Sequence, residues 1–204
     1  IWSSLVGSEM CIRDSSWAAD WSQKHSQYPG WPNILAEEFN VTNIAQAGVS
    51  QYSITQQLKN IYPAEYDRVI VSITSPYRLY TPLHPVHTEG LHANSDLIYT
   101  DLEYHLSEQP NNKRIQSAIG FYKHHFDTKH AEYLHHLLVE DTLKDCDNNY
   151  TLVTSNIYDN EQYVPAGFRY CEGHGIYQSY PGRINHMSEE GNQLFADSMK
   201  LLLE

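Results

Sequence analysis

The sequence predicts a single α/β domain in which helices cover both faces of a mostly parallel central sheet. Residues 67–74 form a β-branched run too continuous for a half-exposed strand, which is typical of a strand buried on both faces. Shorter apolar runs alternate with segments of helical period, and turn-forming residues separate them. A helix between two parallel strands is a βαβ unit with a right-handed crossover, so three layers are the expected architecture.

The composition fits one folded domain with a buried core. The chain has 204 residues, of which 41% are hydrophobic and 19% are charged. Its formal net charge of −12 argues against a nucleic-acid partner and against an anionic membrane surface. No apolar run approaches the roughly 20 residues that a membrane-spanning helix needs, so we expect no membrane span.

The first residues resemble translated sequencing adapter. One reading frame of a common transposase-based adapter encodes the run EMCIRDS, which is 9–15 here, so we predict that 1–15 is a non-native leader. Such a segment is set aside before fold reasoning. Native sequence then resumes at Ser15 or Ser16, and the original first strand or signal peptide is expected to be missing. Localisation stays open for that reason, with the cytoplasm favoured.

The first half of the chain predicts two helices and a strand before the buried run. Apolar residues at helical spacing indicate a helix from Trp31 to about Asn40, and Pro32 is acceptable in its first turn. A short segment at 41–47, β-branched at its start, ends at a glycine and predicts a strand followed by a tight turn. A short helix is expected over 54–62.

The middle of the chain predicts an excursion and then a long helical stretch. Pro and His residues are frequent from Tyr77 to about Ser95 and strand character is absent, so we expect a loop over one edge of the sheet. A helix is expected over 97–106. From 113 to 144 the apolar residues keep a helical period, as one helix or as two that meet near Asp127.

The last part of the chain predicts a strand and a closing helix. Residues 150–154 are a further candidate strand, and 156–183 is expected to be irregular. Ser188 is a suitable cap for the last helix, and Glu189 and Glu190 suit the positive end of its dipole.

Residues able to perform acyl transfer follow the predicted strands. Ser16 follows the position of the first strand, Gly48 the second and Thr74-Ser75 the third, while His186 precedes the last helix. Parallel sheets bind ligands beyond the carboxyl ends of their strands. A serine nucleophile, a histidine that takes its proton, and N–H or hydroxyl donors for the oxyanion are the parts that acyl transfer needs.

These residues lie in four separated blocks. The blocks are Ser16-Trp17-Ala18, Trp31-Pro32-Asn33-Ile34-Leu35-Ala36, Asn43-Ile44-Ala45-Gln46-Ala47-Gly48-Val49-Ser50, and Asn185-His186-Met187-Ser188 with Gly191-Asn192. Together they resemble the SGNH/GDSL hydrolases, a family named for Ser, Gly, Asn and His in separate blocks on a flavodoxin-like sheet. The resemblance implies one domain over 16–204, with an inserted loop or helical segment at about 79–150.

The resemblance also implies the activity. Ser16 matches the nucleophile and His186 the general base, while Gly48, together with Ser16 itself, matches the backbone donors of the oxyanion hole. The expected reaction is hydrolysis of a small acyl ester, such as an acetylated sugar or a lipid-like ester. The family's chemistry uses no metal and no cofactor, and we expect none here.

Three positions depart from the family pattern. The first block reads Asp14-Ser15-Ser16 where Gly-Asp-Ser is usual, so Ser15 is the rival nucleophile if the leader ends elsewhere. The third block lacks its Asn, and Thr74 or Ser75 is expected to donate instead.

In the last block Arg183 stands where the family has the Asp that orients the histidine. A backbone carbonyl, Glu189 or Asp159 could take over that role, and Arg183 near His186 would lower the pKa of the histidine. Arg78 and Asn185 are further candidate site residues.

The remaining histidines and the cysteines predict less. We interpret two groups of histidines as packing or solvated side chains, because neither forms a closed set of metal ligands. Cys146 and Cys171 could be two thiols or one disulfide. His174 is the runner-up catalytic histidine. The two groups are His84, His87 and His92 in the excursion, and His124, His125, His130, His135 and His136 on the long helical stretch.

Two functions therefore remain. The first is a serine esterase that uses Ser16 and His186 as a dyad or triad. The second is a catalytically degraded relative that keeps the cleft as a carbohydrate- or ligand-binding module. The missing Asn and Arg183 favour the second reading, and the intact Ser, Gly and His favour the first.

Overall fold

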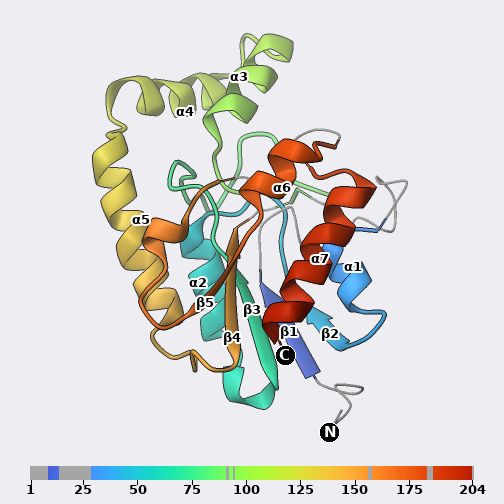
Figure 1. Cartoon of the computed structure of the whole chain (residues 1–204). Coiled ribbons are helices and arrows are strands. Elements are labelled where there is room, and N and C mark those ends of the chain that lie inside the picture. The colour runs from blue at the N-terminus through green and yellow to red at the C-terminus, as the bar shows by residue number, and fades with distance from the viewer. Residues whose placement is uncertain are drawn as a thin grey trace, which may run out of the picture.

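A five-stranded parallel sheet forms the centre of the structure, a computed structural model (Figure 1). The strand order is β2-β1-β3-β4-β5, and every neighbouring pair is parallel. This is the doubly wound flavodoxin-like order, so the predicted fold class is confirmed. The strands are β1 (Glu9–Arg13), β2 (Asn40–Asn43), β3 (Arg68–Ser72), β4 (Thr151–Ser155) and β5 (Arg169–Glu172). The structure describes residues 9–13, 29–90, 92–93, 95–155, 158–182 and 186–203.

The strand β1 lies inside the sheet, between β2 and β3. Ile12 pairs with Asn43 on one side and with Ile70 on the other. Met10, Cys11 and Ile12 are fully buried. A first strand is therefore present, and residues of the predicted leader form it. The coding DNA decides whether it replaces an original strand, so the predicted loss of that original strand stays a prediction.

Two helices cover each face of the sheet (Figure 1). On one face α1 (Trp31–Leu35) packs against α7 (Glu189–Leu203), with the ring of Trp31 edge-on to Phe195 at 5.8 Å. On the other face α2 (Gln51–Lys59) packs against α5 (Thr128–Leu143). The apolar faces of these helices bury both sides of the sheet, which is the three-layer arrangement predicted.

The helices α3 (Tyr99–Glu108) and α4 (Lys113–His124) extend beyond the layers, above the carboxyl edge of the sheet (Figure 1). They have a small core of their own, formed by Leu102, Ile115, Ile119 and Tyr122. The chain then turns at Asp127, whose side chain accepts a hydrogen bond from the N–H of His130 and caps α5. The long helical stretch is thus two helices that meet where the sequence predicted. The segment at about 79–150, predicted to be an insertion, includes α5, and α5 is part of the helical layer on one face of the sheet.

Two elements lie in the stretch predicted to be irregular. They are β5 and the short helix α6 (His174–Ser179). β5 has four residues and pairs with β4 alone, so it is an edge strand with little apolar signal of its own. Single 3-10 turns lie at Pro63–Glu65 and Glu161–Tyr163.

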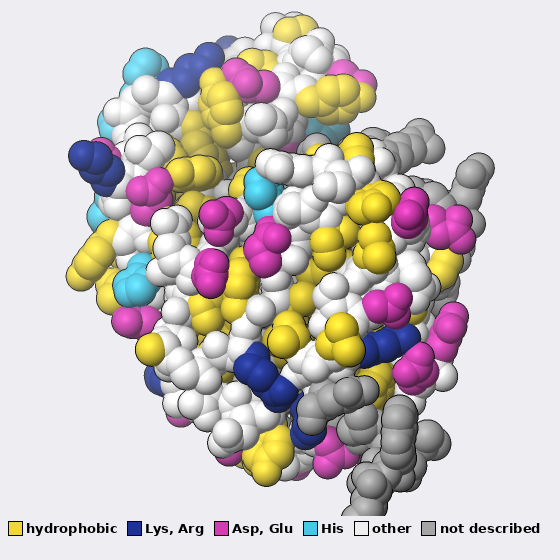
Figure 2. Space-filling model, viewed as in Figure 1, with side chains coloured by type: hydrophobic (Ala, Val, Ile, Leu, Met, Phe, Trp, Pro, Cys, Tyr) yellow, Lys and Arg dark blue, Asp and Glu magenta, His cyan; other side chains and the backbone are white. Residues whose placement is uncertain are grey.

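The surface is rich in acidic side chains (Figure 2), as the net charge of −12 predicts, and the cysteines are separate thiols. Figure 2 shows Asp and Glu side chains scattered over the face drawn there, with Lys and Arg singly or in small groups. All three cysteines lie within the described ranges and none forms a disulfide there, so Cys146 and Cys171 are separate thiols. Within those same ranges, no helix has both the length and the apolar character to cross a membrane.

The start of α7 is held by Ser188 and Asn192. The hydroxyl oxygen of Ser188 accepts a hydrogen bond from the N–H of Gly191, so the predicted cap is confirmed. The buried side chain of Asn192 accepts from the N–H of Trp31 at 3.0 Å. Its amide nitrogen donates to the carbonyl oxygens of Met187 and Ser188. One side chain therefore joins α1, α7 and the loop that carries His186.

We expect Asn192→Ala to lower the free energy of unfolding by about 1–3 kcal/mol, because it removes the side-chain partner of the buried N–H of Trp31 and of the carbonyl of Met187. Urea denaturation measures the change. The control is Gln193→Ala, at the exposed neighbouring position, which we expect to change stability by no more than about 0.5 kcal/mol. Equal effects of the two substitutions would contradict the role given to Asn192.

Candidate active site

The loops at the carboxyl edge of the sheet hold the candidate catalytic residues. Gly48 follows β2, Thr74 follows β3, and His186 precedes α7. The chain leaves β1 at Arg13, three residues before Ser16. The strand order reverses between β1 and β3, and ligands bind at such a switch point. The candidate nucleophiles Ser16 and Ser15 lie outside the described residues, as do Arg183 and Asn185.

Gly48 forms the tight turn that the sequence predicted. Its φ is +76°, a left-handed conformation that glycine adopts without strain. A Cβ atom at this position would lie 2.7 Å from the Cβ of Ser95, so any residue larger than glycine would also clash with Ser95. The carbonyl oxygen of Gly48 accepts a hydrogen bond from the N–H of Asp96. No described residue accepts a hydrogen bond from the N–H of Gly48.

Asp96 fixes the surroundings of this turn, although no sequence motif marks it. The residue is 1% exposed. One carboxylate oxygen accepts hydrogen bonds from the N–H of Ser50 and the hydroxyl of Ser53, both at 2.7 Å. The other accepts from the N–H of Thr81 at 2.9 Å. A buried carboxylate needs several donors, and here they come from α2 and from the excursion, so both are held to the Gly48 turn.

Thr74 and Ser75 are placed beside this edge but serve mainly to hold the chain. The N–H of Thr74 donates to the side-chain oxygen of Gln51 at 3.4 Å, and its carbonyl oxygen accepts from the side chain of Asn160 at 3.1 Å. The hydroxyl of Ser75 accepts from the N–H of Tyr77. Thr74 is 2% exposed, and its hydroxyl makes no hydrogen bond to the residues described.

Arg78 contacts the same region. Its guanidinium donates a hydrogen bond to the carbonyl oxygen of Val49 at 2.9 Å. Arg78, a candidate site residue, thus lies next to the Gly48 turn. His174, the runner-up histidine, lies at the start of α6, where its ring pairs with the side chain of Gln178. Glu189 and Asp159, the alternative orienting residues, are exposed.

His186 lies in the loop before α7. Its carbonyl oxygen accepts a hydrogen bond from the N–H of Gly182, and the next residue, Met187, is fully buried in the core. Burial, with a smaller contribution from nearby His92, lowers the pKa of His186 to about 4. The imidazole is therefore neutral at pH 7, which is the form a general base needs.

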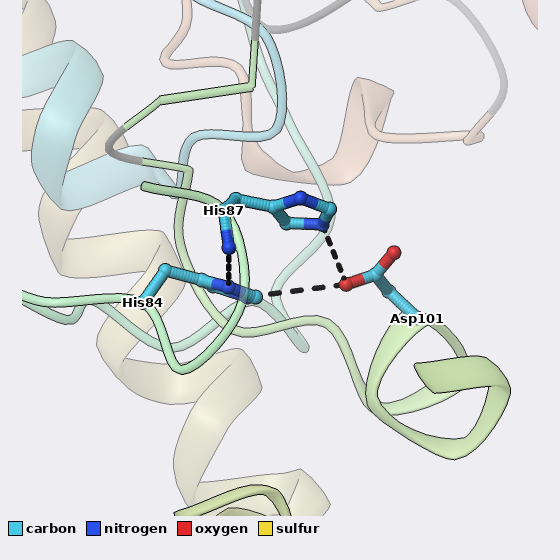
Figure 3. A group of neighbouring side chains, drawn as sticks. All are labelled: His84, His87 and Asp101. Carbon is cyan, nitrogen blue, oxygen red and sulfur yellow. Dashed lines mark hydrogen bonds and ion pairs between the residues drawn. The ribbon is translucent and has the colours of Figure 1, made fainter. Parts of the chain in front are cut away.

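A second group of polar side chains lies in the excursion above the sheet. Nε2 of His87 is 3.0 Å from Oδ2 of Asp101, and Nε2 of His84 is 3.9 Å from the same oxygen (Figure 3). The ligand atoms of these three residues all lie within 4.8 Å of one another, so the group could hold a metal ion. The sequence interpretation of His84 and His87 as packing or solvated side chains did not include Asp101, which lies on α3.

The electrostatics of this group follow from burial and proximity. Burial, and then the neighbouring His87, lower the pKa of His84 to about 4. Burial alone would raise the pKa of Asp101, but the hydrogen bond from His87 and the charges of the histidines outweigh it, so the pKa is lowered. At pH 7 Asp101 is thus an anion beside a neutral His84.

One more buried histidine lies on α5. His135 is 3% exposed, its Nε2 has no hydrogen-bond partner among the described residues, and its ring lies edge-on to Tyr163 at 4.8 Å. Burial, with a smaller effect of His136, lowers its pKa to about 4. It is a packing residue, as the sequence predicted.

The fold and its carboxyl edge define a doubly wound parallel α/β protein. No protein-family model matches the chain, and no curated protein matches it. Among solved structures, a salicylyl-acyltransferase, SsfX3, from a tetracycline biosynthetic pathway is similar over 96% of this chain, with 11% identity and a TM-score of 0.39. The chain covers 55% of that protein's length. A similarity of this size carries no argument about activity.

The Gly48 turn gives the first prediction for this edge. Alanine at a left-handed position costs about 1–3 kcal/mol in backbone strain. Gly90 has a similar φ of +75°, but a Cβ there would meet no atom within 4 Å. We therefore expect Gly48→Ala to destabilise the protein more than Gly90→Ala does, because only the first adds a clash with Ser95. Thermal unfolding of both variants measures the difference, and equal losses would show that the contact with Ser95 is unimportant.

His135 gives a prediction about pH. Its pKa is near 4 when folded and near 6.5 when unfolded, so the unfolded chain binds more protons between these values. We expect this histidine to reduce the free energy of unfolding by about 3 kcal/mol as the pH falls from 6.5 to 4. His135→Phe keeps a ring against Tyr163 and should lose less stability over that range. The control is His124→Gln, at an exposed site, which should match the parent; a parent-like acid loss in His135→Phe would contradict the prediction.

Proposed function

We propose that this protein is a serine esterase in which Ser16 is the nucleophile and His186 the general base. The observation that carries the proposal is the Gly48 turn beyond the carboxyl end of β2, whose N–H has no acceptor among the described residues. A second observation supports it: His186 lies at the same edge of the sheet, in the loop that leads into α7. The sequence blocks that resemble the SGNH/GDSL hydrolases supply the roles.

In the proposed reaction the hydroxyl of Ser16 attacks the acyl carbon while His186 takes its proton. The N–H groups of Gly48 and Ser16 donate to the oxyanion that forms. The ester C–O bond then breaks, and the proton passes from His186 to the leaving alcohol. Water, deprotonated by His186, attacks the acyl-serine and releases the carboxylic acid with free Ser16. His186 returns the proton taken from water to the oxygen of Ser16, so the ester and one water are the only reactants consumed.

An aromatic pair favours an acylated carbohydrate as the substrate. Tyr52 and Tyr80 are both exposed, and their ring centroids lie 4.7 Å apart. Tyr52 is in the first turn of α2, and Tyr80 precedes Thr81, whose N–H donates to Asp96 beside Gly48. Exposed aromatic faces next to polar groups suit a ligand with apolar ring faces and hydroxyl edges.

The second candidate, a catalytically degraded binding relative, is favoured by one observation. The N–H of Thr74 is used by Gln51, and the hydroxyl of Ser75 accepts from Tyr77 but keeps its own hydrogen, so the position of the absent third-block Asn offers the oxyanion only two buried hydroxyls, those of Thr74 and Ser75. An oxyanion hole with two backbone donors would have to suffice for catalysis.

Hydrolysis of a short-chain aryl ester tests the proposal. We expect Ser16→Ala and His186→Ala each to lower kcat by at least about 1000-fold, because the dyad acts as a unit. Ser107→Ala, at an exposed position of α3, is the control and should keep the parent rate. Since His186 stays neutral well below pH 6, the acid limb of kcat/KM should fall near pH 4, the pKa of that histidine.

Variants that keep the parent activity would refute the dyad, and an acid limb near pH 6.5 would refute the lowered pKa of His186. An inactive parent that still binds an acylated sugar, measured by calorimetry, would favour the degraded relative.

A further inference from the structure

Three side chains from two elements meet in the excursion above the sheet (Figure 3). His84 and His87 lie on one tight turn of the loop, and Asp101 lies in the first turn of α3. Figure 3 shows both imidazole rings directed toward the carboxylate of Asp101. Oδ2 of Asp101 is 3.0 Å from Nε2 of His87 and 3.9 Å from Nε2 of His84.

The ring of His84 leaves one polar atom unexplained. Its side chain is 0% exposed. Its Nδ1 accepts hydrogen bonds from the N–H groups of Val86 and His87 at 3.2 and 3.0 Å, so Nε2 carries the ring hydrogen. The 3.9 Å from this atom to Asp101 is too long for a hydrogen bond, and no described residue accepts one from it. A buried polar atom without a partner points to a missing ligand.

Further histidines surround the group. Nε2 of His105 is 3.6 Å from Oδ1 of Asp101, and its ring lies edge-on to that of His87 at 5.1 Å. His92 lies against the other side of His87, with ring centroids 5.4 Å apart. In metal sites hydrogen bonds from outer partners hold a carboxylate ligand in place, and His105 would have to move slightly closer than 3.6 Å to orient Asp101 in this way.

We propose that His84, His87 and Asp101 bind a divalent transition-metal ion, with Zn²⁺ as the representative ion. Two imidazole nitrogens and one carboxylate oxygen are a ligand set that Zn²⁺ and neighbouring metals accept, and a fourth position stays open for water or another ligand. Ligand atoms about 2.0–2.2 Å from one ion lie roughly 3.3 Å apart in a tetrahedral site. The two distances to Oδ2 of Asp101, 3.0 and 3.9 Å, lie on either side of that value.

The ligand atoms are already gathered, but the hydrogen bonds of the two rings have to change before an ion binds. The ring hydrogens on Nε2 of His84 and on Nε2 of His87 both have to leave, because Nε2 of His87 donates to Asp101 in the metal-free structure. When Nε2 of His84 binds the metal, the ring hydrogen resides on Nδ1, and the two amide hydrogen bonds to Nδ1 break. Metal binding therefore opens the turn from His84 to His87.

This inference is independent of ester hydrolysis, because none of its three ligands takes part in the proposed dyad or oxyanion hole. The competing explanation is a metal-free cluster in which a water molecule bridges His84 and Asp101. The two explanations differ in affinity for Zn²⁺ and in the tautomer of His84.

Titration of the whole chain with Zn²⁺ alone at pH 7, followed by calorimetry, tests the site. We expect saturable binding that His87→Gln and Asp101→Asn each weaken by about 100-fold or more, since each removes a direct ligand. His105→Gln should weaken binding by about 10- to 100-fold, because it frees Asp101 to turn. The control His124→Gln, at an exposed site on α4, should bind Zn²⁺ like the parent, and Mg²⁺ should not compete.

His87 and Asp101 are partly exposed, so both variants are expected to fold; their unfolding curves without metal check this. Nitrogen-15 spectra of the histidine rings give a second readout. In the metal-free chain Nδ1 of His84 should resonate as an unprotonated nitrogen, and saturation with Zn²⁺ should convert it to a protonated one. Binding that both variants leave unchanged, an absence of saturable binding, or an unaltered Nδ1 signal at saturation would each overturn the proposal.

Discussion

The pairing of β1 with both of its neighbours is the constraint on which the rest of the structure depends. The strand β2 has no partner in the sheet except β1, and β3 meets β1 on one side and β4 on the other. Without β1 the sheet would lose β2 and the edge where Gly48 turns the chain. Because β1 is parallel to both neighbours and covered by helices on both faces, it needs only a short apolar run, and Met10, Cys11 and Ile12 supply it.

A buried carboxylate extends this constraint to the candidate active site. Asp96 receives hydrogen bonds from α2, through Ser50 and Ser53, and from the excursion, through Thr81. Its own N–H holds the carbonyl of Gly48. The geometry of the glycine turn is thereby set from outside the block of sequence that contains it. Packing of this kind keeps the shape of this edge of the sheet independent of the sequence of the Gly48 block itself.

The sequence predicted the fold well where local signals were strong. The buried strand over β3, the break at Asp127 and the cap at Ser188 were each confirmed within a few residues, because β-branched runs and capping side chains act locally. β5 was missed because an edge strand of four residues has almost no apolar period. The original first strand was expected to be missing because the sequence of β1 resembles adapter.

The site was predictable only in part. Gly48 was identified because a tight turn demands glycine, and its φ of +76° agrees. Asp96 and Asp101 were not identified, because their partners lie up to 46 residues away and nothing in a single sequence marks a long-range hydrogen bond. His84 and His87 are three residues apart, so the sequence alone suggests that they lie close together. The position of Asp101 beside them depends on how α3 packs against α4, which the sequence does not show.

The excursion is closed at its neck. Leu79 and Leu97 exchange two backbone hydrogen bonds, of 3.1 and 2.8 Å, and Thr81 is tied to Asp96 just above them. The two ends of the loop are thus fixed to each other as well as to the sheet, so the entropy of closing it depends only weakly on how many residues lie between. Ala93 and Ser95 contact Gln46 and Gly48, so only the part of the loop before Ala93 can be lengthened, shortened or exchanged without disturbing the edge below. Changes in ligand preference would therefore be expected in this part of the loop first, while the sheet edge stays the same.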